Sequence, residues 1–217
     1  MIDLNAEQLA QCTGARIDRA TEHLPGLLDA MEKFSIDTPE RQSAFLAQIG
    51  HESSGLKWLS EIWGPTPQQK RYERDYHHPW PDSSEQAKEP AYAPNRLAYG
   101  LGNAAPGDGR RFMGRGLMQI TGYKNYWATL DQLREALPGM VVPDFLAHPE
   151  DLASPFWAAM SAANFWRAHN LNKWADAGDF DGLSDAINIG HKTEAEGDAN
   201  GYAHRLALYT KAKEILA

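Results

Sequence analysis

The stretch FLAQIGHESSGLKWLSEIW, residues 45–63, joins an apolar helical segment to two acidic residues. Thr38 precedes it, and threonine is a favoured N-cap that predicts the start of a helix. Apolar residues then recur at helical spacing as far as Glu52, and Gly55 predicts the end of the helix. Glu52 is therefore expected in the last helical turn, and Glu61 lies beyond the break.

These two carboxylates suggest acid/base chemistry. The negative end of the helix macrodipole and an apolar neighbourhood would both favour a protonated Glu52, as a general acid requires. A chain reversal would bring Glu61, which lies between Trp58 and Trp63, opposite Glu52. A protonated and an ionised carboxyl group are the working pair of a glycosidase. The chain has 29 acidic residues, so two of them nine positions apart also fit an unrelated pair.

Helical periodicity dominates the rest of the chain. The middle, residues 64–111, contains seven prolines and predicts a long irregular segment with short helical turns at 68–75 and 91–98. Residues 117–120 form at most a short strand-like piece. The pattern predicts a mainly α-helical protein with a loop-rich middle and at most a small β element. Further helices are expected at 19–34, 124–137, 155–169, 180–189 and 201–216.

Composition excludes several classes of function. The net charge of −8 argues against a nucleic-acid partner, which would require a basic surface. The N-terminal sequence MIDLNAEQLAQ lacks the basic and apolar regions of a signal peptide, and no stretch is long enough to insert into a membrane. We therefore expect synthesis in the cytoplasm. The single cysteine cannot form an intramolecular disulfide, and the eight histidines lack metal-ligand spacing, so we expect neither metal nor cofactor.

Three motifs occur in order along the chain: AFLAQIGHESSGL (44–56), GNAAPGDGRRFMGRGLMQITGYKNY (102–126), and DAINIG (185–190) followed by GYAHRLALY (201–209). Together they resemble glycoside hydrolase family 19, in particular the chitinase-like lysozymes of phage and prophage endolysins. The resemblance covers roughly residues 20–212 and implies a lysozyme-like, two-lobed helical fold with a cleft between the lobes. It also implies one catalytic domain over residues 1–217, without a separate cell-wall-binding module.

The resemblance assigns the catalytic roles. Glu52 matches the general acid of the family's H-E-[ST] motif, and Glu61 matches a second acidic position that we assign as the base. Glu73 is a rival base, because it lies 21 positions after Glu52, close to the acid–base spacing of plant-type members. The choice between Glu61 and Glu73 stays open at this stage.

The resemblance also implies substrate-binding residues. Gln119, Thr121 and Asn125 match positions that hold sugar, with Thr121 also positioning water, and Tyr123 is a candidate for stacking on a sugar. Loop-capping amides are the alternative for Gln119 and Asn125. Arg115 matches an arginine that is structural or paired with an acid. Asn188 and Arg205 match residues that line the cleft, although Arg205 also suits a solvated helix face.

Two departures from the family pattern stand out. Ile189 replaces the first glycine of the usual I-N-G-G motif, which alters backbone freedom beside Asn188. The segment 74–100 does not match the phage-type version, and either a lid or specificity loop or a solvated insertion would account for it.

The resemblance implies a peptidoglycan-degrading endolysin, a muramidase that cuts the β-1,4 bond between N-acetylmuramic acid and N-acetylglucosamine with inversion. Chitin hydrolysis, a lytic transglycosylase and a non-catalytic glycan-binding protein are the alternatives, and the sequence does not decide between peptidoglycan and chitin. Because the chain is acidic, bulk attraction to an anionic wall is not expected. We expect a monomer that acts in the periplasm or cell wall after release by a pore-forming, holin-type partner.

Overall fold

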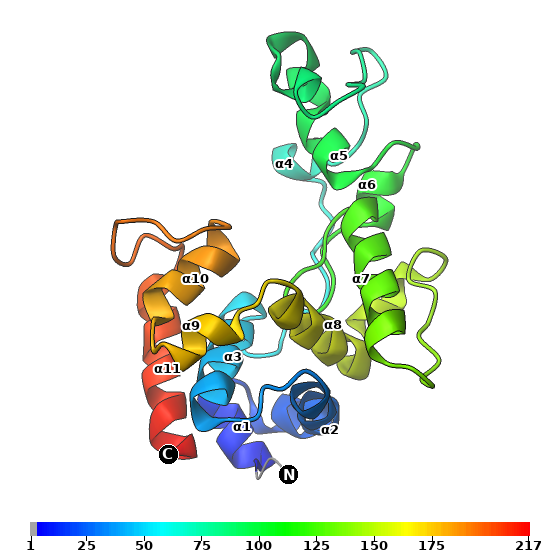
Figure 1. Ribbon diagram of the computed structural model, residues 1–217. Coiled ribbons are helices and arrows are strands. Elements are labelled where there is room, and N and C mark those ends of the chain that lie inside the picture. Colours follow the sequence, from blue (N-terminus) through cyan, green and yellow to red (C-terminus); the bar gives the residue numbers. More distant parts are fainter. Residues whose placement is uncertain (1–3) are drawn as a thin grey trace. The chain divides into compact units, whose positions relative to one another are not determined.

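The computed structural model describes residues 4–217, so the first three residues of the N-terminal sequence considered above lie outside it. The chain is mainly α-helical, as predicted, and it divides into two compact units (Figure 1). Unit 1 contains the described residues up to Leu59, then Gly116–Met118 and Ser154–Ala217. Unit 2 contains Ser60–Arg115 and Gln119–Ala153.

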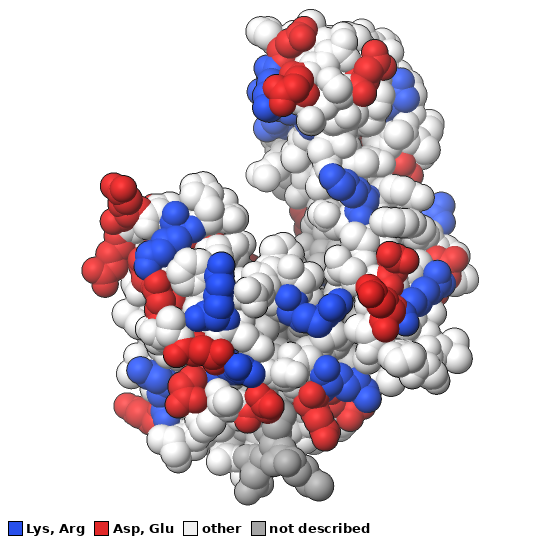
Figure 2. Space-filling model, in the orientation of Figure 1, with Lys and Arg blue, Asp and Glu red and all other residues white. Residues whose placement is uncertain are grey.

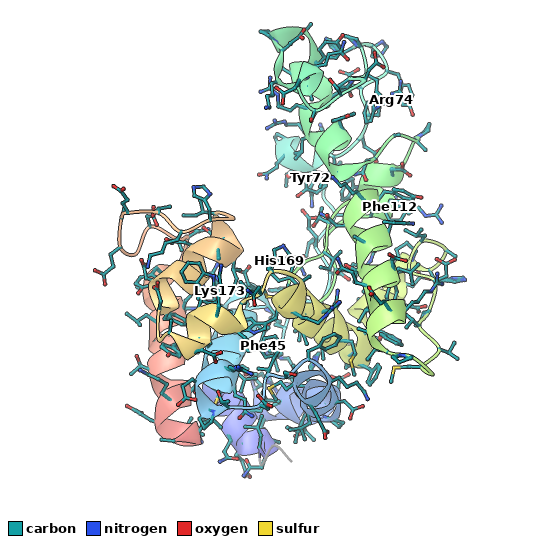
Figure 3. All side chains as sticks on the ribbon, viewed as in Figure 1. Phe45, Tyr72, Arg74, Phe112, His169 and Lys173 are labelled. Carbon is teal, nitrogen blue, oxygen red and sulfur yellow. The ribbon has the colours of Figure 1, made fainter. Side chains whose placement is uncertain are left out.

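Unit 1 is a helical bundle around α3. This helix packs against α1, α9 and α11, while α2 packs against α8 (Figure 1). Residues 42–50 of α3 are all buried, among them Phe45, which is labelled in Figure 3. Phe45 packs edge to face against Trp166 of α8, with 5.4 Å between the ring centroids. The helices of this unit are α1 (Ala6–Thr13), α2 (Ile17–Lys33), α3 (Pro39–Glu52), α8 (Pro155–Ala168), α9 (Asn172–Asp176), α10 (Phe180–Asn188) and α11 (Tyr202–Leu216).

The predicted start and end of α3 are confirmed. The Thr38 hydroxyl accepts a hydrogen bond from the backbone of Arg41, and Glu52 is the last helical residue. Beyond it the backbone turns sharply, with φ of +69° at Gly55. A side chain at this glycine would lie 2.6 Å from the carbonyl oxygen of Gly14, so both the turn and the close approach require glycine.

Unit 2 is built from α7 and a series of short helices. The long loop predicted at residues 64–111 contains more helical turns than expected. Among the helices of unit 2, only α7 is longer than six residues. The elements are α4 (Pro67–Lys70), η1 (Gln86–Lys88), η2 (Pro90–Asn95), α5 (Arg96–Leu101), α6 (Asp108–Arg111), α7 (Tyr123–Ala136) and η3 (Pro149–Ala153), where η denotes a 3-10 helix.

The segment 74–100 is held by its own hydrogen bonds. The buried Asn95 side chain accepts from the backbone of Asp75 and donates to the carbonyl oxygens of Asp75, His78 and Pro79. The Arg74 guanidinium lies 4.8 Å from the ring centre of Trp80. This segment is therefore a folded substructure, whichever of its two predicted roles applies.

At residues 117–120 the structure stays within the prediction of at most a short strand-like piece. Only isolated bridges form here, between Ser60 and Arg115 and between Arg115 and Ile120. The backbone has positive φ at Gly116 and Gln119, which turns the chain instead of extending it. The small β element is therefore limited to these bridges within the described chain.

The surface carries charged side chains of both signs, although the net charge is −8. Acidic and basic residues are interspersed on the face shown in Figure 2. None of the helices in residues 4–217 combines the length and apolar character that crossing a membrane requires. Over the same residues, no group of three or more His, Cys, Asp and Glu side chains is arranged to hold a metal ion.

Candidate functional site

In unit 1, Glu52 is held by Arg205. The two side chains form an ion pair, with 2.6 Å between Arg205 Nη2 and Glu52 Oε1, and this pair links the end of α3 to α11. The Arg205 side chain is only 1% exposed, whereas the Glu52 side chain is 26% exposed. The prediction of apolar surroundings for Glu52 is therefore wrong in one respect, because a buried cation contacts its carboxylate.

Arg205 is itself fixed by two further acceptors. Its Nη1 donates to Gln48 Oε1 at 2.5 Å, and its Nε donates to the carbonyl oxygen of Asn200 at 3.0 Å. Gln48 in turn donates to the Ser184 hydroxyl at 2.9 Å. Buried in this way, Arg205 does not lie on a solvated helix face, so that alternative is wrong, while its predicted place in the cleft stays a prediction. It contacts the carboxylate of Glu52.

Asn188 belongs to the same framework. It is exposed at the end of α10, and its Oδ1 accepts from the backbone N–H of Asn200 at 2.8 Å. Asn200 thus connects Asn188 to Arg205. The replacement of glycine by Ile189 leaves the helix intact up to Asn188, and φ at Ile189 is −102°, which any residue adopts.

Asp185, three residues before Asn188 in α10, has a raised pKa. Asp185 is fully buried and accepts from the backbone N–H of Thr193 at 3.0 Å. Burial raises the pKa of Asp185, and the nearby negative charges of Asp181 and Asp198 act in the same direction. The residue is thus a buried anchor for the 190s segment that leads to Asn200.

Two histidines lie beside the Glu52–Arg205 pair. His51 and His204, which precede Glu52 and Arg205 in the chain, approach to 2.9 Å between their Nδ1 atoms. Burial lowers the pKa of His51, the positive charge of Arg205 lowers it further, and Glu52 opposes the shift. Two neutral imidazoles can share one proton across this contact, but two imidazolium rings cannot.

In unit 2, Glu61 is oriented by hydrogen bonds to its carboxylate and from its backbone N–H. Its carboxylate accepts from Gln69 Nε2 at 2.9 Å and from the backbone N–H of Gly114 at 3.1 Å. Its own backbone N–H donates to the carbonyl oxygen of Gly114 at 2.8 Å. Tyr72, labelled in Figure 3, is hydrogen-bonded to Glu61. Burial raises the pKa of Tyr72, and the charge and hydrogen bond of Glu61 raise it further.

Gly114 brings Glu61 together with two of the predicted sugar-binding residues. A side chain at Gly114 would lie 2.6 Å from Gln119 Oε1 and 3.1 Å from Thr121 Oγ1. Glycine is therefore needed where these groups converge. Asn125 donates to the carbonyl oxygen of Thr121 at 2.7 Å, as the loop-capping alternative predicted.

Tyr123 and Arg115 have different environments. Tyr123 begins α7, is 41% exposed and packs edge to face against Phe112. Arg115 donates to the carbonyl oxygen of Arg111 and to the Tyr126 hydroxyl, at 2.7 and 2.8 Å, so the structural alternative predicted for it is confirmed.

Glu73 has a separate position in unit 2. Its two carboxylate oxygens accept from the backbone N–H groups of Gly107 and Arg110, at 3.1 and 3.0 Å. These bonds hold the start of α6. The structure therefore places Glu61, but not Glu73, against the glycine that Thr121 and Gln119 contact.

Sequence reasoning missed several residues of these two clusters. Gln48 lies one helical turn before Glu52, a spacing that puts both side chains on one face of α3 and was a usable signal. Gln69 forms a capping box with Thr66, which its spacing also signalled, but its bond to Glu61 did not follow from any local pattern. The pairing of His51 with His204 joins residues 153 positions apart and left no trace in the sequence.

Unit 1 thus presents the half-buried Glu52, and unit 2 presents Glu61 and Glu73, which are also half-buried; polar contacts fix all three carboxylates. Hydrolysis of a glycosidic bond uses two such carboxyl groups, one as acid and one as base. The arrangement within each unit is consistent with this chemistry.

Comparisons with known proteins agree with this reading. No family model matches the chain. A glycosyl hydrolase family 19 domain-containing protein of Haemophilus influenzae is 31% identical over 194 residues, covering 82% of each chain. Chitinase C of Streptomyces griseus has a TM-score of 0.60 at 19% identity, over 98% of this chain and 76% of its own. A bacterial family 19 chitinase has a TM-score of 0.57 at 21% identity, over 98% and 94%.

Proposed function

The chain belongs to glycosyl hydrolase family 19 and is a glycoside hydrolase, and from this we propose that it is a peptidoglycan-degrading muramidase. Its target would be the β-1,4 bond between N-acetylmuramic acid and N-acetylglucosamine. The observation that carries the chemistry is the pair of oriented glutamates, Glu52 against Arg205 and Glu61 against Gly114.

In the proposed mechanism, Glu52 protonates the leaving oxygen. Arg205 holds Oε1 of Glu52, which leaves Oε2 as the oxygen that would carry the proton. The ion pair fixes the direction of the carboxyl group, since a buried guanidinium has little freedom to move.

Glu61 would act as the base. It removes a proton from a water molecule that attacks the opposite face of the sugar, so the configuration at the anomeric carbon inverts. Thr121 Oγ1 supports this role, because it converges with Glu61 on Gly114 and offers a hydroxyl to position the water. Inversion requires about 6.5–9.5 Å between the two carboxyl groups. Glu73 remains the rival base.

Chitin hydrolysis is the second candidate. The observation that favours it is the likeness in fold to two chitinases. Both substrates contain β-1,4-linked N-acetylglucosamine, so the catalytic steps above would be the same.

Product analysis tests the proposal. The enzyme is incubated with purified peptidoglycan and, separately, with soluble chito-oligosaccharides, and the products are identified by mass spectrometry. We expect muropeptides with reducing N-acetylmuramic acid ends. Cleavage of chito-oligosaccharides alone would establish the chitinase, 1,6-anhydro ends would establish a lytic transglycosylase, and binding without cleavage would establish a glycan-binding protein.

We further propose an endolysin role, in which a monomer reaches the wall through a pore-forming partner. The motif resemblance to phage and prophage lysozymes supports it. Expression in a Gram-negative host should cause lysis only when a holin is co-expressed. Lysis by the enzyme alone would contradict dependence on such a partner.

A further inference from the structure

Unit 2 contains a cavity that the proposed catalytic steps do not use. Its volume is about 570 Å³, within the range of small-molecule sites. Trp63 and Pro65 form apolar parts of its wall, and three arginines, Arg110, Arg111 and Arg115, supply much of the rest.

The arginines in this wall have neutral partners. Arg111 donates to the carbonyl oxygen of Leu146 at 2.6 Å, and Arg115 donates to a carbonyl and a hydroxyl oxygen. None of the three arginines forms an ion pair with another residue in 4–217. Their positive charges are therefore not neutralised by direct contact.

Two carboxylates also line the cavity, and each already has a hydrogen-bond or charge partner. Glu73 accepts two backbone hydrogen bonds at the start of α6. The exposed Glu150 lies 3.6 Å from His148 Nδ1. Three cations against two engaged carboxylates make a local positive site in a chain whose net charge is −8.

The cavity lies beside the proposed base. Arg115 directly follows Gly114, whose backbone N–H holds Glu61, and it forms a bridge with Ser60. Trp63 lies two residues after Glu61. A substituent on the sugar that reacts at Glu61 would have a short path to the arginines.

We propose that this cavity binds the carboxylate of the peptide stem carried by N-acetylmuramic acid. Guanidinium groups bind carboxylates through paired, charge-assisted hydrogen bonds, and the tryptophan and proline suit the apolar parts of a short peptide. The inference rests on the proposed muramidase function and deepens it, because chitin has no such group. The site would favour peptidoglycan over chitin.

Kinetics on two forms of the same glycan test this site. One form is glycan strands that keep their peptide stems, and the other is the same strands after an amidase has removed the stems. The variant is Arg110→Gln, since Arg110 is exposed, and Arg134→Gln, an exposed arginine of α7 that does not line the cavity, is the matched control.

We expect the wild type to have a lower KM for stemmed strands. Arg110→Gln should raise that KM about ten-fold, as expected for loss of a charge-assisted hydrogen bond, and should leave the stem-free reaction unchanged. Arg110→Lys should recover part of the loss, and Arg134→Gln should behave as the wild type.

The outcomes separate this inference from the proposed function. If the wild type cuts neither form, the muramidase function fails. If it cuts both with equal KM, or if Arg110→Gln slows both equally, the function stands and the stem site is overturned. In a binding assay with competitors, N-acetylmuramoyl dipeptide should bind more tightly than inorganic phosphate, and the reverse order would assign the cavity to phosphate instead.

Discussion

At the scale of single residues, the two partners of the Glu52–Arg205 pair differ in how deeply their side chains are buried. The guanidinium is buried and satisfied by Gln48, Asn200 and Glu52, while the carboxylate keeps partial access to solvent. A buried charge is costly unless it is fully hydrogen-bonded, so this arrangement is better explained as a means of orienting Glu52 than as a source of stability.

Replacing Arg205 tests this view. Arg205→Ala would leave Gln48 and Glu52 without their partner, so we expect a loss of about 1–3 kcal/mol in the free energy of unfolding, measured in urea. We also expect a fall in kcat, with Arg205→Lys recovering part of it. Arg16→Ala is the control, because its 73% exposed side chain forms only a surface pair. Equal effects of the two alanine substitutions would contradict the orienting role.

His51 predicts a pH dependence of stability. Its pKa in the folded protein is lowered below the ordinary value of 6.5, so below that pH the unfolded chain binds more protons than the folded one. The contribution of His51 to stability is therefore lost as the pH falls below about 6.5.

Urea unfolding between about pH 7.5 and 5.5 measures this effect. The wild type should lose stability across this window, and His51→Gln should show a smaller slope. His77→Gln, which changes an exposed loop histidine, should follow the wild type. A His51→Gln slope equal to that of the wild type would show that this group is not responsible.

At the scale of helices, apolar periodicity predicted the longer elements well. The bounds of α3 agree with its N-cap at Thr38 and its expected end, and α7, α8, α10 and α11 lie close to their predicted ranges. The short α1, α6 and α9 were missed, because a helix of eight or fewer residues shows too few periods of the pattern. Turns at 116–122 depend on positive φ, which residue type indicates only at the glycines.

Two glycines in helices predict opposite effects of the same substitution. A methyl group at Gly50 in α3 would lie 2.5 Å from the carbonyl oxygen of Thr13 in α1, whereas Gly100 in α5 has open space. Alanine has the higher helix propensity, by about 1 kcal/mol. Gly50→Ala should nevertheless destabilise the protein, because the backbone of α1 must move, and Gly100→Ala should be neutral or stabilising. Thermal unfolding of both variants decides this, and a stabilised Gly50→Ala would show that α1 and α3 are not so closely packed.

At the scale of the whole molecule, the contacts of the candidate site residues could not be predicted from the sequence. Family motifs indicated Glu52, Glu61, Gln119 and Thr121, and the last three converge on Gly114. The burial of Arg205 and its bond to Gln48 depend on packing between α3 and α11, which are 150 residues apart in the chain and leave no local pattern. Long-range contacts of this kind are what the sequence alone could not supply.

The proposed acid, Glu52, belongs to unit 1, and the proposed base, Glu61, belongs to unit 2. Each residue is therefore tested by its own substitution.

The most direct test is the initial rate of reducing-end release from purified peptidoglycan by Glu52→Gln, Glu61→Gln and Glu73→Gln. The account predicts that Glu52→Gln and Glu61→Gln each lose about 100-fold or more while remaining folded, because each loses a proton-transfer group. It predicts that Glu73→Gln stays within about 10-fold of the wild type, the loss of a backbone contact rather than of a base. A wild-type rate for Glu52→Gln, or an active Glu61→Gln beside an inactive Glu73→Gln, would contradict it.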